Sequence, residues 1–380
     1  MFPMRKKIVV LDMWASVAVA SGPSTHWLYA QLAKEFDVEI IGLSQNRFSD
    51  IPLLCRSFRP DKKAWADKYY RLKESAVKTP GSFRTLTNRY AKKIASLSYR
   101  PDLIFQLGGL FGPVGLPGVP YLSYHDQTVR MVEQGWSNWL PENFSLYRDE
   151  FYALEKKLFK HLDKIIAYSE SAKKSFNTDY GIENKNIDVI NSAVKMTYPG
   201  PEDVFKARKR QLLFVSTNFF LKGGDYVVDS FSIIKNKFPD MKLIIAGTKL
   251  PAEVNFDDSA IKYVGHLSLE ELQRYYCESA ILLHPARYDA FPNVVKEAVV
   301  CGLPAIASAS CGIPEILDYG RAGLLLKELS AAELANQVIK LLEDPQLYQQ
   351  LQERCLMVRD RFDVANVGRK MIETFQAFLQ

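Results

Sequence analysis

Short apolar runs alternate with amphipathic segments along most of the chain. The first apolar run covers residues 7–11, a segment with helical spacing follows and ends near Phe36, and a second apolar run covers 38–43. Buried strands that alternate with helices in this way are typical of parallel α/β sheets. The pattern therefore predicts that the chain opens with the strand–helix–strand unit of an α/β domain.

The same alternation continues to about residue 195, interrupted by a segment rich in Lys and Arg. Beyond that segment the pattern predicts a helix that starts at Ser169, another over 141–161, and three short strands over 102–107, 119–124 and 164–168. These elements complete a first domain, for which we expect the bounds 1–197.

The alternation lapses around 196–210, and Tyr198-Pro199-Gly200-Pro201-Glu202 predicts a linker there, because its prolines and glycine can continue neither a helix nor a strand. We predict an α/β fold of two doubly wound, Rossmann-like domains facing a cleft, with 205–362 as the second domain and a helix over 363–380 packing back on the first. The elements expected after the linker are strands over 212–216, 241–246, 280–284 and 304–307, and helices over 223–237, 269–278, 292–301, 330–343 and 345–380, the last broken near Asp363.

The composition of the 380 residues is that of an ordinary globular enzyme, with 47% hydrophobic and 24% charged residues. The five cysteines are scattered and lack the spacing of a zinc site, which indicates a reducing compartment and not a disulfide framework. The apolar run near the N-terminus is too short for a secretory signal, and no run reaches the ~18 apolar residues of a membrane span. We therefore expect a cytoplasmic protein.

Positive charge is concentrated in residues 56–100, which we call the basic segment. It holds 13 Lys and Arg against three acids, a net +10 within a chain whose total is +6, and aromatic residues are interleaved. One interpretation is a solvated helical insertion. The other is a patch that rests on anionic lipid, where each Lys or Arg near the surface contributes ~1 kcal/mol. We do not expect nucleic-acid binding, since no recognised binding module accompanies the charge.

The strongest chemical signal lies between His284 and Pro304. Pro292 suits the first position of a helix and Gly302 its C-terminal end, so the helix presents free backbone amides near Asn293. Such a helix N-terminus favours anions. Two acids flank it: Asp289 precedes the helix, and Glu297 lies within it among apolar residues, where a buried carboxylate needs a hydrogen-bonding partner.

These residues resemble the signature of the retaining glycosyltransferase family 4, which has the fold called GT-B. The signature is two acids separated by seven residues around a Phe-Pro-Asn sequence, here Asp289 and Glu297. The resemblance extends to Ser310-Cys311-Gly312-Ile313-Pro314-Glu315, to Phe214 through Gly224, and to Ile166-Ala167-Tyr168-Ser169. It is strong over 212–326 and weaker over 1–195.

The resemblance implies a role for each residue of the signature. Glu297 would hold the ribose hydroxyls of a nucleotide, and Asp289 the hydroxyls of a donor sugar. Lys222 would lie against the diphosphate and offset the charge that develops on the leaving group. The family's arginine five residues before this lysine is replaced by Thr217, for which Arg287 is a candidate substitute. Further donor contacts are expected from Asn218, Phe291, Pro292, Asn293 and Val294.

In the first half the resemblance is carried by fewer residues. Gly22, in Ser21-Gly22-Pro23, stands where the family has a glycine loop that reaches toward phosphate, and glycine permits close backbone approach. His125 ends a predicted strand, where the family has a histidine near the sugar, and Asp126 is expected to orient it or to cap the next turn. The resemblance implies no metal and no cofactor, because the nucleotide sugar is itself the donor substrate.

The sequence thus predicts a retaining glycosyltransferase that uses a nucleotide-diphosphate sugar and a glycan or lipid-linked acceptor in envelope or exopolysaccharide synthesis. Two alternatives stay open. One is a different GT-B enzyme, such as a sugar-nucleotide epimerase or an inverting transferase. The other is a non-catalytic protein that binds nucleotide sugars, which Thr217 and the shortened acid at Asp289 favour.

Overall fold

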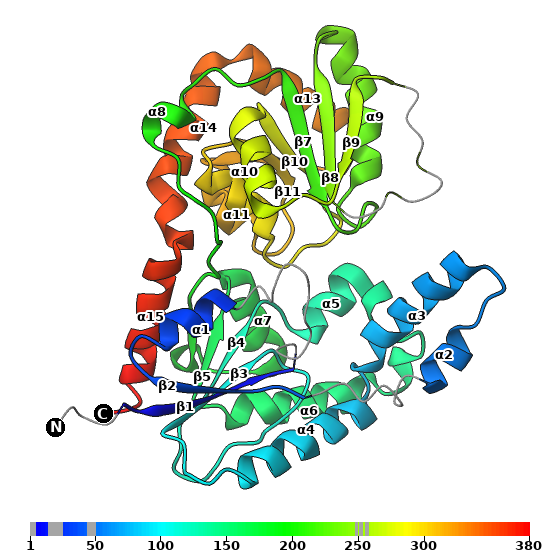
Figure 1. The fold of residues 1–380 in the computed structure, drawn as a ribbon. Coiled ribbons are helices and arrows are strands. Elements are labelled where there is room, and N and C mark those ends of the chain that lie inside the picture. Colours follow the sequence, from blue (N-terminus) through cyan, green and yellow to red (C-terminus); the bar gives the residue numbers. More distant parts are fainter. Residues whose placement is uncertain (1–4, 14–25, 44–50, 248–249, 251–253, 255–257) are drawn as a thin grey trace. The chain divides into compact units, whose positions relative to one another are not determined.

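The computed structural model describes residues 5–13, 26–43, 51–247, 250, 254 and 258–380. They form two units of similar size (Figure 1). The first contains residues up to Ile190 together with Gly368–Gln380, and the second spans Asn191–Val367. The last helix of the chain therefore starts in the second unit and ends in the first.

The first unit is built on a sheet of parallel strands in the order β2-β1-β3-β4-β5-β6. Helices α4 and α6 run along one side of this sheet in Figure 1. The strands are β1 (Lys7–Asp12), β2 (Asp37–Ile41), β3 (Leu103–Leu107), β4 (Tyr121–His125), β5 (Lys164–Ala167) and β6 (Ile187–Val189). The helices are α1 (His26–Leu32), α2 (Ile51–Ser57), α3 (Lys62–Ala76), α4 (Pro80–Ala95), α5 (Val129–Trp136), α6 (Arg148–His161) and α7 (Glu170–Tyr180).

The C-terminal segment of the chain packs into the core of the first unit. Phe375, in α15 (Val364–Gln376), is fully buried. Its ring centroid lies 6.0 Å from that of Phe36 and 4.8 Å from that of Phe105, which is on β3. Burial of a large aromatic side chain stabilises such a contact by roughly 1.5–3 kcal/mol, which explains why this short segment stays with the first sheet.

The basic segment is helical, and its helices start at capping side chains. Asp61 accepts a hydrogen bond from Ala64 N at 2.7 Å at the start of α3, and Thr79 accepts one from Ser82 N at 3.2 Å at the start of α4. Such caps satisfy amides that the helix leaves unpaired. One cation of the segment does not belong to the surface: Lys78 is fully buried, with its ammonium 3.4 Å from the centre of the Trp139 ring.

The second unit is also built on a parallel sheet, in the order β12-β11-β10-β7-β8-β9. Counted from its own first strand, this is the Rossmann order 3-2-1-4-5-6. The chain reverses its direction of winding between β7 and β10, and ligands bind such sheets at this point, outside the carboxyl ends of the strands. The strands are β7 (Gln211–Ser216), β8 (Lys242–Gly247), β9 (Ile261–Gly265), β10 (Ile281–His284), β11 (Ala305–Ser308) and β12 (Gly323–Leu326).

Helices cover both faces of the second sheet. Buried side chains of α9 and α13 share a hydrophobic core with one face, including Val227, Phe231, Leu334 and Val338. The helices are α8 (Pro201–Val204), α9 (Gly224–Lys237), α10 (Leu269–Glu278), α11 (Asn293–Val300), α12 (Ile313–Ile316), α13 (Ala331–Glu343) and α14 (Pro345–Val358). Two doubly wound Rossmann-like units are thus confirmed.

Several predicted elements differ in extent. The helix expected over 141–161 begins only at Arg148, after a single 3-10 turn over Phe144–Leu146, because Pro141 starts a turn and not the helix. Pro292 is the residue that precedes α11 and not its first helical residue. The segment expected to be a pure linker contains α8, and the closing helix breaks at Asp363 as predicted.

Candidate functional site

Two loops meet at the carboxyl edge of the second sheet. One follows β7 and carries Lys222, and the other follows β10 and carries Asp289. A backbone hydrogen bond of 2.9 Å joins them, from Arg287 N to Leu221 O. Gly223 lies so close to the second loop that a Cβ atom there would stand 2.1 Å from Pro285 O, and its φ of +78° is one that favours glycine. The two loops therefore form one compact structure.

Lys222 and Asp289 form an ion pair at this edge. Lys222 Nζ donates to Asp289 Oδ2 at 2.6 Å and to Tyr288 O at 3.1 Å, and both side chains are less than one-fifth exposed. His284 Nε2 lies 3.4 Å from the same carboxylate oxygen. Burial alone would raise the pKa of Asp289, but His284 and Lys222 together hold this pKa below its ordinary value. The pair thus keeps an anion and a cation available side by side.

The N-terminus of α11 lies directly after this loop. Pro292 precedes the helix, Asn293 is exposed, Val294 is half-buried, and the Phe291 ring is buried. The first amides of a helix have no partner within it and carry part of its positive dipole, so they suit an anion such as a phosphate. Phe291, Pro292, Asn293 and Val294, the four residues predicted here to contact the donor, thus lie together at the start of α11.

Glu297, one turn further along α11, has a partner that sequence reasoning missed. Tyr276, which is fully buried in α10, donates from its hydroxyl to Glu297 Oε2 at 2.8 Å. Burial raises the pKa of Glu297, against the opposing effects of this hydrogen bond and of the Lys296 charge. Only Oε2 is used by the tyrosine. The arrangement orients the carboxylate and suits it to accept hydrogen bonds from hydroxyl groups.

Lys296 was also missed, although it stands inside the signature itself. It is fully buried, and its Nζ donates to Ser192 O at 3.0 Å and to the Ser192 hydroxyl. The same ammonium lies 5.0 Å from the centre of the Phe291 ring. Burial lowers the pKa of Lys296 to about 7, although Glu297 and Asp289 oppose this shift. The signal that could have identified Lys296 in the sequence was a lysine at a core-facing position of a predicted helix.

We expect Lys296→Met to change how stability depends on pH. The native pKa of about 7 lies below the ordinary 10.5, so the unfolded chain binds more protons between these values. The free energy of unfolding of the wild type should therefore rise relative to the variant, by on the order of 3 kcal/mol between pH 7 and about pH 9.5. Urea unfolding of both proteins measures this difference. Parallel pH dependences would show that Lys296 is not desolvated.

Arg287 does not lie beside Lys222 as a second free cation. Its guanidinium donates to Asp225 Oδ1 at 2.8 Å and Oδ2 at 2.5 Å, and also to Phe220 O. A bidentate pair of this kind occupies the guanidinium. Asn218 is exposed and stabilises the Lys222 loop, because its Oδ1 accepts from Leu221 N at 3.2 Å and its carbonyl from Lys222 N at 3.0 Å.

Of the two first-unit residues predicted to contact the donor, the structure describes only His125. His125 ends β4, as predicted; it is 1% exposed and packs edge-on against Phe159 and Phe176. Its Nε2 lies 2.7 Å from Ser123 Oγ, and burial lowers its pKa to about 3, so the ring is neutral at pH 7. Contact with a donor sugar stays a prediction. Gly22 lies outside the described residues.

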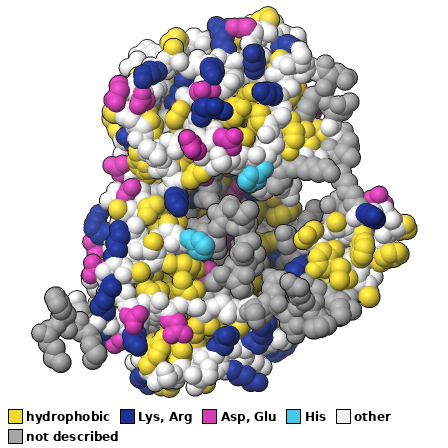
Figure 2. Space-filling model, in the orientation of Figure 1, with side chains coloured by type: hydrophobic (Ala, Val, Ile, Leu, Met, Phe, Trp, Pro, Cys, Tyr) yellow, Lys and Arg dark blue, Asp and Glu magenta, His cyan; other side chains and the backbone are white. Residues whose placement is uncertain are grey.

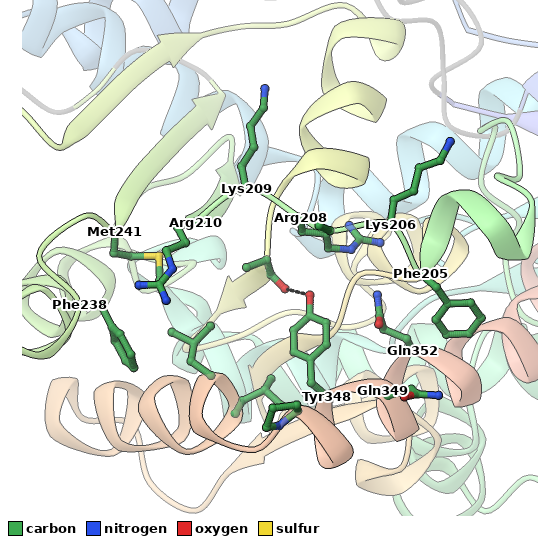
Figure 3. Close-up of a pocket in the computed structure, with 15 residues that line it drawn as sticks. Phe205, Lys206, Arg208, Lys209, Arg210, Phe238, Met241, Tyr348, Gln349 and Gln352 are labelled. Carbon is green, nitrogen blue, oxygen red and sulfur yellow. Dashed lines mark hydrogen bonds between the residues drawn. The ribbon is translucent and has the colours of Figure 1, made fainter.

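A pocket of about 490 Å³ lies at the other end of the second sheet (Figure 3). It is lined by the residues that lead into β7, β8 and β10 and by α14, whose Tyr348 hydroxyl donates to Ala280 O at 2.6 Å. None of the predicted site residues lines it. Its cations are already paired, Lys209 with Glu278 at 2.6 Å and Arg210 with Asp240 at 2.9 Å. This pocket is therefore distinct from the site at the carboxyl edge.

Residues 201–355, which include every second-unit residue of the site, match the model of a family described as glycosyl transferases group 1. An uncharacterized glycosyltransferase of Haemophilus influenzae is 24% identical over 226 residues, 57% of this chain and 61% of that protein. An uncharacterized 41.2 kDa protein in the cps region of Klebsiella pneumoniae is 28% identical over 198 residues, 50% of this chain and 54% of that protein.

The chain thus spans little more than half the length of these two curated relatives. A solved structure extends the likeness to both units. Anabaena HepE in complex with UDP-glucose aligns over 98% of this chain and 99% of its own, with a TM-score of 0.66 and 16% identity. At that identity the likeness concerns the fold, which is the GT-B fold with two Rossmann-like units that the sequence predicts.

Proposed function

We propose that this protein is a retaining glycosyltransferase that moves a sugar from a nucleotide-diphosphate sugar to a glycan or lipid-linked acceptor. One observation carries the proposal: Lys222 and Asp289 form a 2.6 Å ion pair at the switch point of a Rossmann sheet, beside the free amides of α11. An anion-binding helix end, a cation and an oriented acid are the groups that a sugar diphosphate requires.

Each group has a task in this reaction. The amides of Asn293 and Val294, with the Lys222 ammonium, would hold the diphosphate and stabilise the charge that grows on it as the bond to the sugar breaks. Asp289, kept ionised by its neighbours, would accept hydrogen bonds from the donor sugar. Glu297 would accept them from the ribose, with Tyr276 holding the carboxylate in place. The leaving phosphate is the proposed acceptor of the incoming hydroxyl proton.

The relatives support the class of donor and the setting. HepE was crystallised with UDP-glucose, and the Klebsiella relative is encoded in a cps region. We therefore propose a nucleotide sugar as donor, with no separate cofactor or metal, and a role in envelope or exopolysaccharide synthesis. A sugar-nucleotide epimerase is the alternative, and it is recognised by a free epimerised sugar formed without any acceptor.

A thermal-shift screen of UDP-, GDP- and ADP-sugars, with and without EDTA, tests the proposal. We expect one nucleotide class to raise the melting temperature, and the same class to be hydrolysed slowly in the absence of acceptor. EDTA should leave both effects unchanged. Stabilisation by a nucleotide sugar without any hydrolysis would favour the non-catalytic alternative, and a protein that no nucleotide sugar stabilises would act on another ligand.

The surface of α2 and α3 supports a peripheral position on the inner face of the plasma membrane. Hydrophobic side chains gather there in Figure 2, and Leu54, Phe58 and Tyr70 are 37%, 60% and 63% exposed. Exposed cations stand beside them, at Arg56, Arg59 and Lys62. Apolar insertion combined with attraction to anionic head groups is how proteins lie on a bilayer. Within the described residues, no helix has the length and hydrophobicity to cross one.

We expect the protein to sediment with anionic vesicles and not with neutral ones. Salt should abolish this binding as the Debye length falls from ~10 Å at 0.1 M to ~3 Å at 1 M. Replacing Arg56, Arg59 and Lys62 by Gln should weaken it by at least about tenfold, since each cation contributes ~1 kcal/mol.

The matched control removes three exposed cations of α4, Arg89, Lys92 and Lys93, which lie on another helix of the same segment. This variant should keep most of the binding. Equal loss of vesicle binding in both variants would show that the total charge matters and not the surface of α2 and α3. Equal binding to anionic and neutral vesicles would favour the other interpretation of the basic segment, a solvated helical insertion.

A further inference from the structure

His284 is a buried histidine at the edge of the proposed donor site. It is the last residue of β10, which lies between β7 and β11 near the middle of the second sheet, and it is 1% exposed. Neither ring nitrogen makes a hydrogen bond to any described residue. A buried polar group without a partner costs free energy, whereas an apolar side chain such as Leu would fill the same place without this cost. The position therefore indicates a role that an apolar side chain could not perform.

The imidazole of His284 faces the carboxylate of Asp289. Its Nε2 lies 3.4 Å from Asp289 Oδ2, slightly beyond the ordinary N–H···O distance. Lys222 Nζ already donates to the same oxygen at 2.6 Å, whereas no described residue donates to Oδ1. His284 therefore lies next to an oxygen that a closer partner occupies, and the other oxygen of Asp289 is left for a ligand.

A bound diphosphate would change the balance of charge at this edge. Lys222 would then lie between two anions, Asp289 and the diphosphate, while the guanidinium of Arg287 is held by Asp225 through hydrogen bonds of 2.8 and 2.5 Å. Two anions that share one cation disfavour each other's charged form, so each is held less strongly. Asp289 consequently needs a further donor when Lys222 turns toward the leaving group, and His284 is placed to be that donor.

We propose that His284 is a positioning residue for Asp289. Its Nε2–H donates to Oδ2 as the diphosphate draws the Lys222 ammonium away, so the carboxylate stays ionised and keeps Oδ1 turned toward the donor sugar. The movement required is about half an ångström, from 3.4 Å to the ~2.9 Å of an ordinary hydrogen bond. This role rests on the proposed function, whereas the contact between the two side chains does not, so one of the two tests is independent of turnover.

The test that is independent of turnover is the protonation of the His284 ring. Full-length protein labelled with ¹⁵N in its histidines gives a long-range proton–nitrogen correlation spectrum, in which the His284→Gln variant identifies the two resonances of this ring. We expect Nε2 to carry a proton, and its resonance to shift when Asp289 is replaced by Asn. A ring protonated only on Nδ1 cannot donate to Oδ2, and this result would overturn the proposal whatever the protein catalyses.

Gln and Asn are a matched pair of replacements for the kinetic test. Both carry a neutral amide, but the amide nitrogen of Gln reaches about as far as Nε2 of the ring, and that of Asn only as far as Nδ1. With the nucleotide sugar that stabilises the wild type most, His284→Gln should keep at least about one-third of kcat. His284→Asn should lower kcat by about 10- to 100-fold and change the donor KM by less than about threefold, because the contact forms as charge moves onto the diphosphate.

The outcomes distinguish positioning from packing and from failure of the proposed function. Equal losses of kcat in the Gln and Asn variants, or a change confined to KM, would mean that His284 only fills space, and this would overturn the proposal. Urea unfolding checks that both variants fold, and if the Asn variant does not, the ring protonation of the wild type decides. A wild type that turns over no nucleotide sugar contradicts the proposed function, and the same spectrum still shows whether His284 donates to Asp289.

Discussion

Replacing Glu297 by Ala should remove useful turnover and most of the discrimination for ribose. A hydrogen bond to a charged group contributes about 1.5–3 kcal/mol, so loss of two ribose contacts predicts a fall in kcat/KM of about 100-fold or more. The sharper expectation concerns the nucleotide. The wild type should bind the 2′-deoxy form about 10- to 100-fold more weakly than the ribose form, whereas E297A should bind both alike within about threefold.

Calorimetric titration of the two nucleotides into the two proteins measures this coupling. Tyr276→Phe is the matched control, because it removes only the hydroxyl that orients Glu297. We expect it to weaken ribose binding by about 3- to 10-fold while keeping the preference for ribose. If the wild type bound both nucleotides with equal affinity, or if E297A still preferred the ribose form, Glu297 would not be part of the donor site.

Replacing Lys222 by Ala should lower kcat by about 100- to 1,000-fold while KM for the donor changes by less than about threefold. The reason is that charge on the diphosphate grows toward the transition state, so a cation aimed at it acts more strongly there than on the bound donor. Steady-state kinetics over a range of donor concentrations separates the two constants. A change confined to KM would mean that Lys222 only binds the donor.

The control for this substitution is a lysine in a similar ion pair elsewhere in the same unit. Lys235 pairs with Asp258 at 2.5 Å, and its replacement by Ala should leave kcat unchanged. Because Lys222→Ala also removes the cation that pairs with Asp289, Lys222→Arg is the second variant. It keeps the charge, and we expect it to recover part of kcat. Equal losses in the Ala and Arg variants would point to a structural role.

Much of the fold could be predicted because apolar runs, glycines and prolines mark the bounds of many helices and strands clearly. The alternation of apolar runs with amphipathic segments located β7, β8 and β10, and Gly302 with Pro304 located the end of α11. The strands that were missed are short or lie away from the centre of a sheet. β6 has three residues, and β9 is only half-buried, so neither produces a clear apolar run.

The site was predictable in its residue types but not in its pairings. Nothing in the sequence joins Lys222 to Asp289, which are 67 positions apart, because the contact depends on parallel pairing of β7 with β10. Tyr276 stands in an ordinary amphipathic helix, where a buried tyrosine is usually a packing residue. The burial of His125 could not be predicted either, since the end of a strand does not decide whether a side chain faces solvent or the core.

The most direct test of the central claim is the stereochemistry of sugar release. The nucleotide sugar that stabilises the protein most is incubated with it, and proton NMR follows the anomeric configuration of the first sugar product. We predict that a nucleoside diphosphate is released and that the first-formed product has the configuration of the donor. A product of inverted configuration would contradict retention, and failure to turn over any UDP-, GDP- or ADP-sugar would contradict the assignment as a glycosyltransferase.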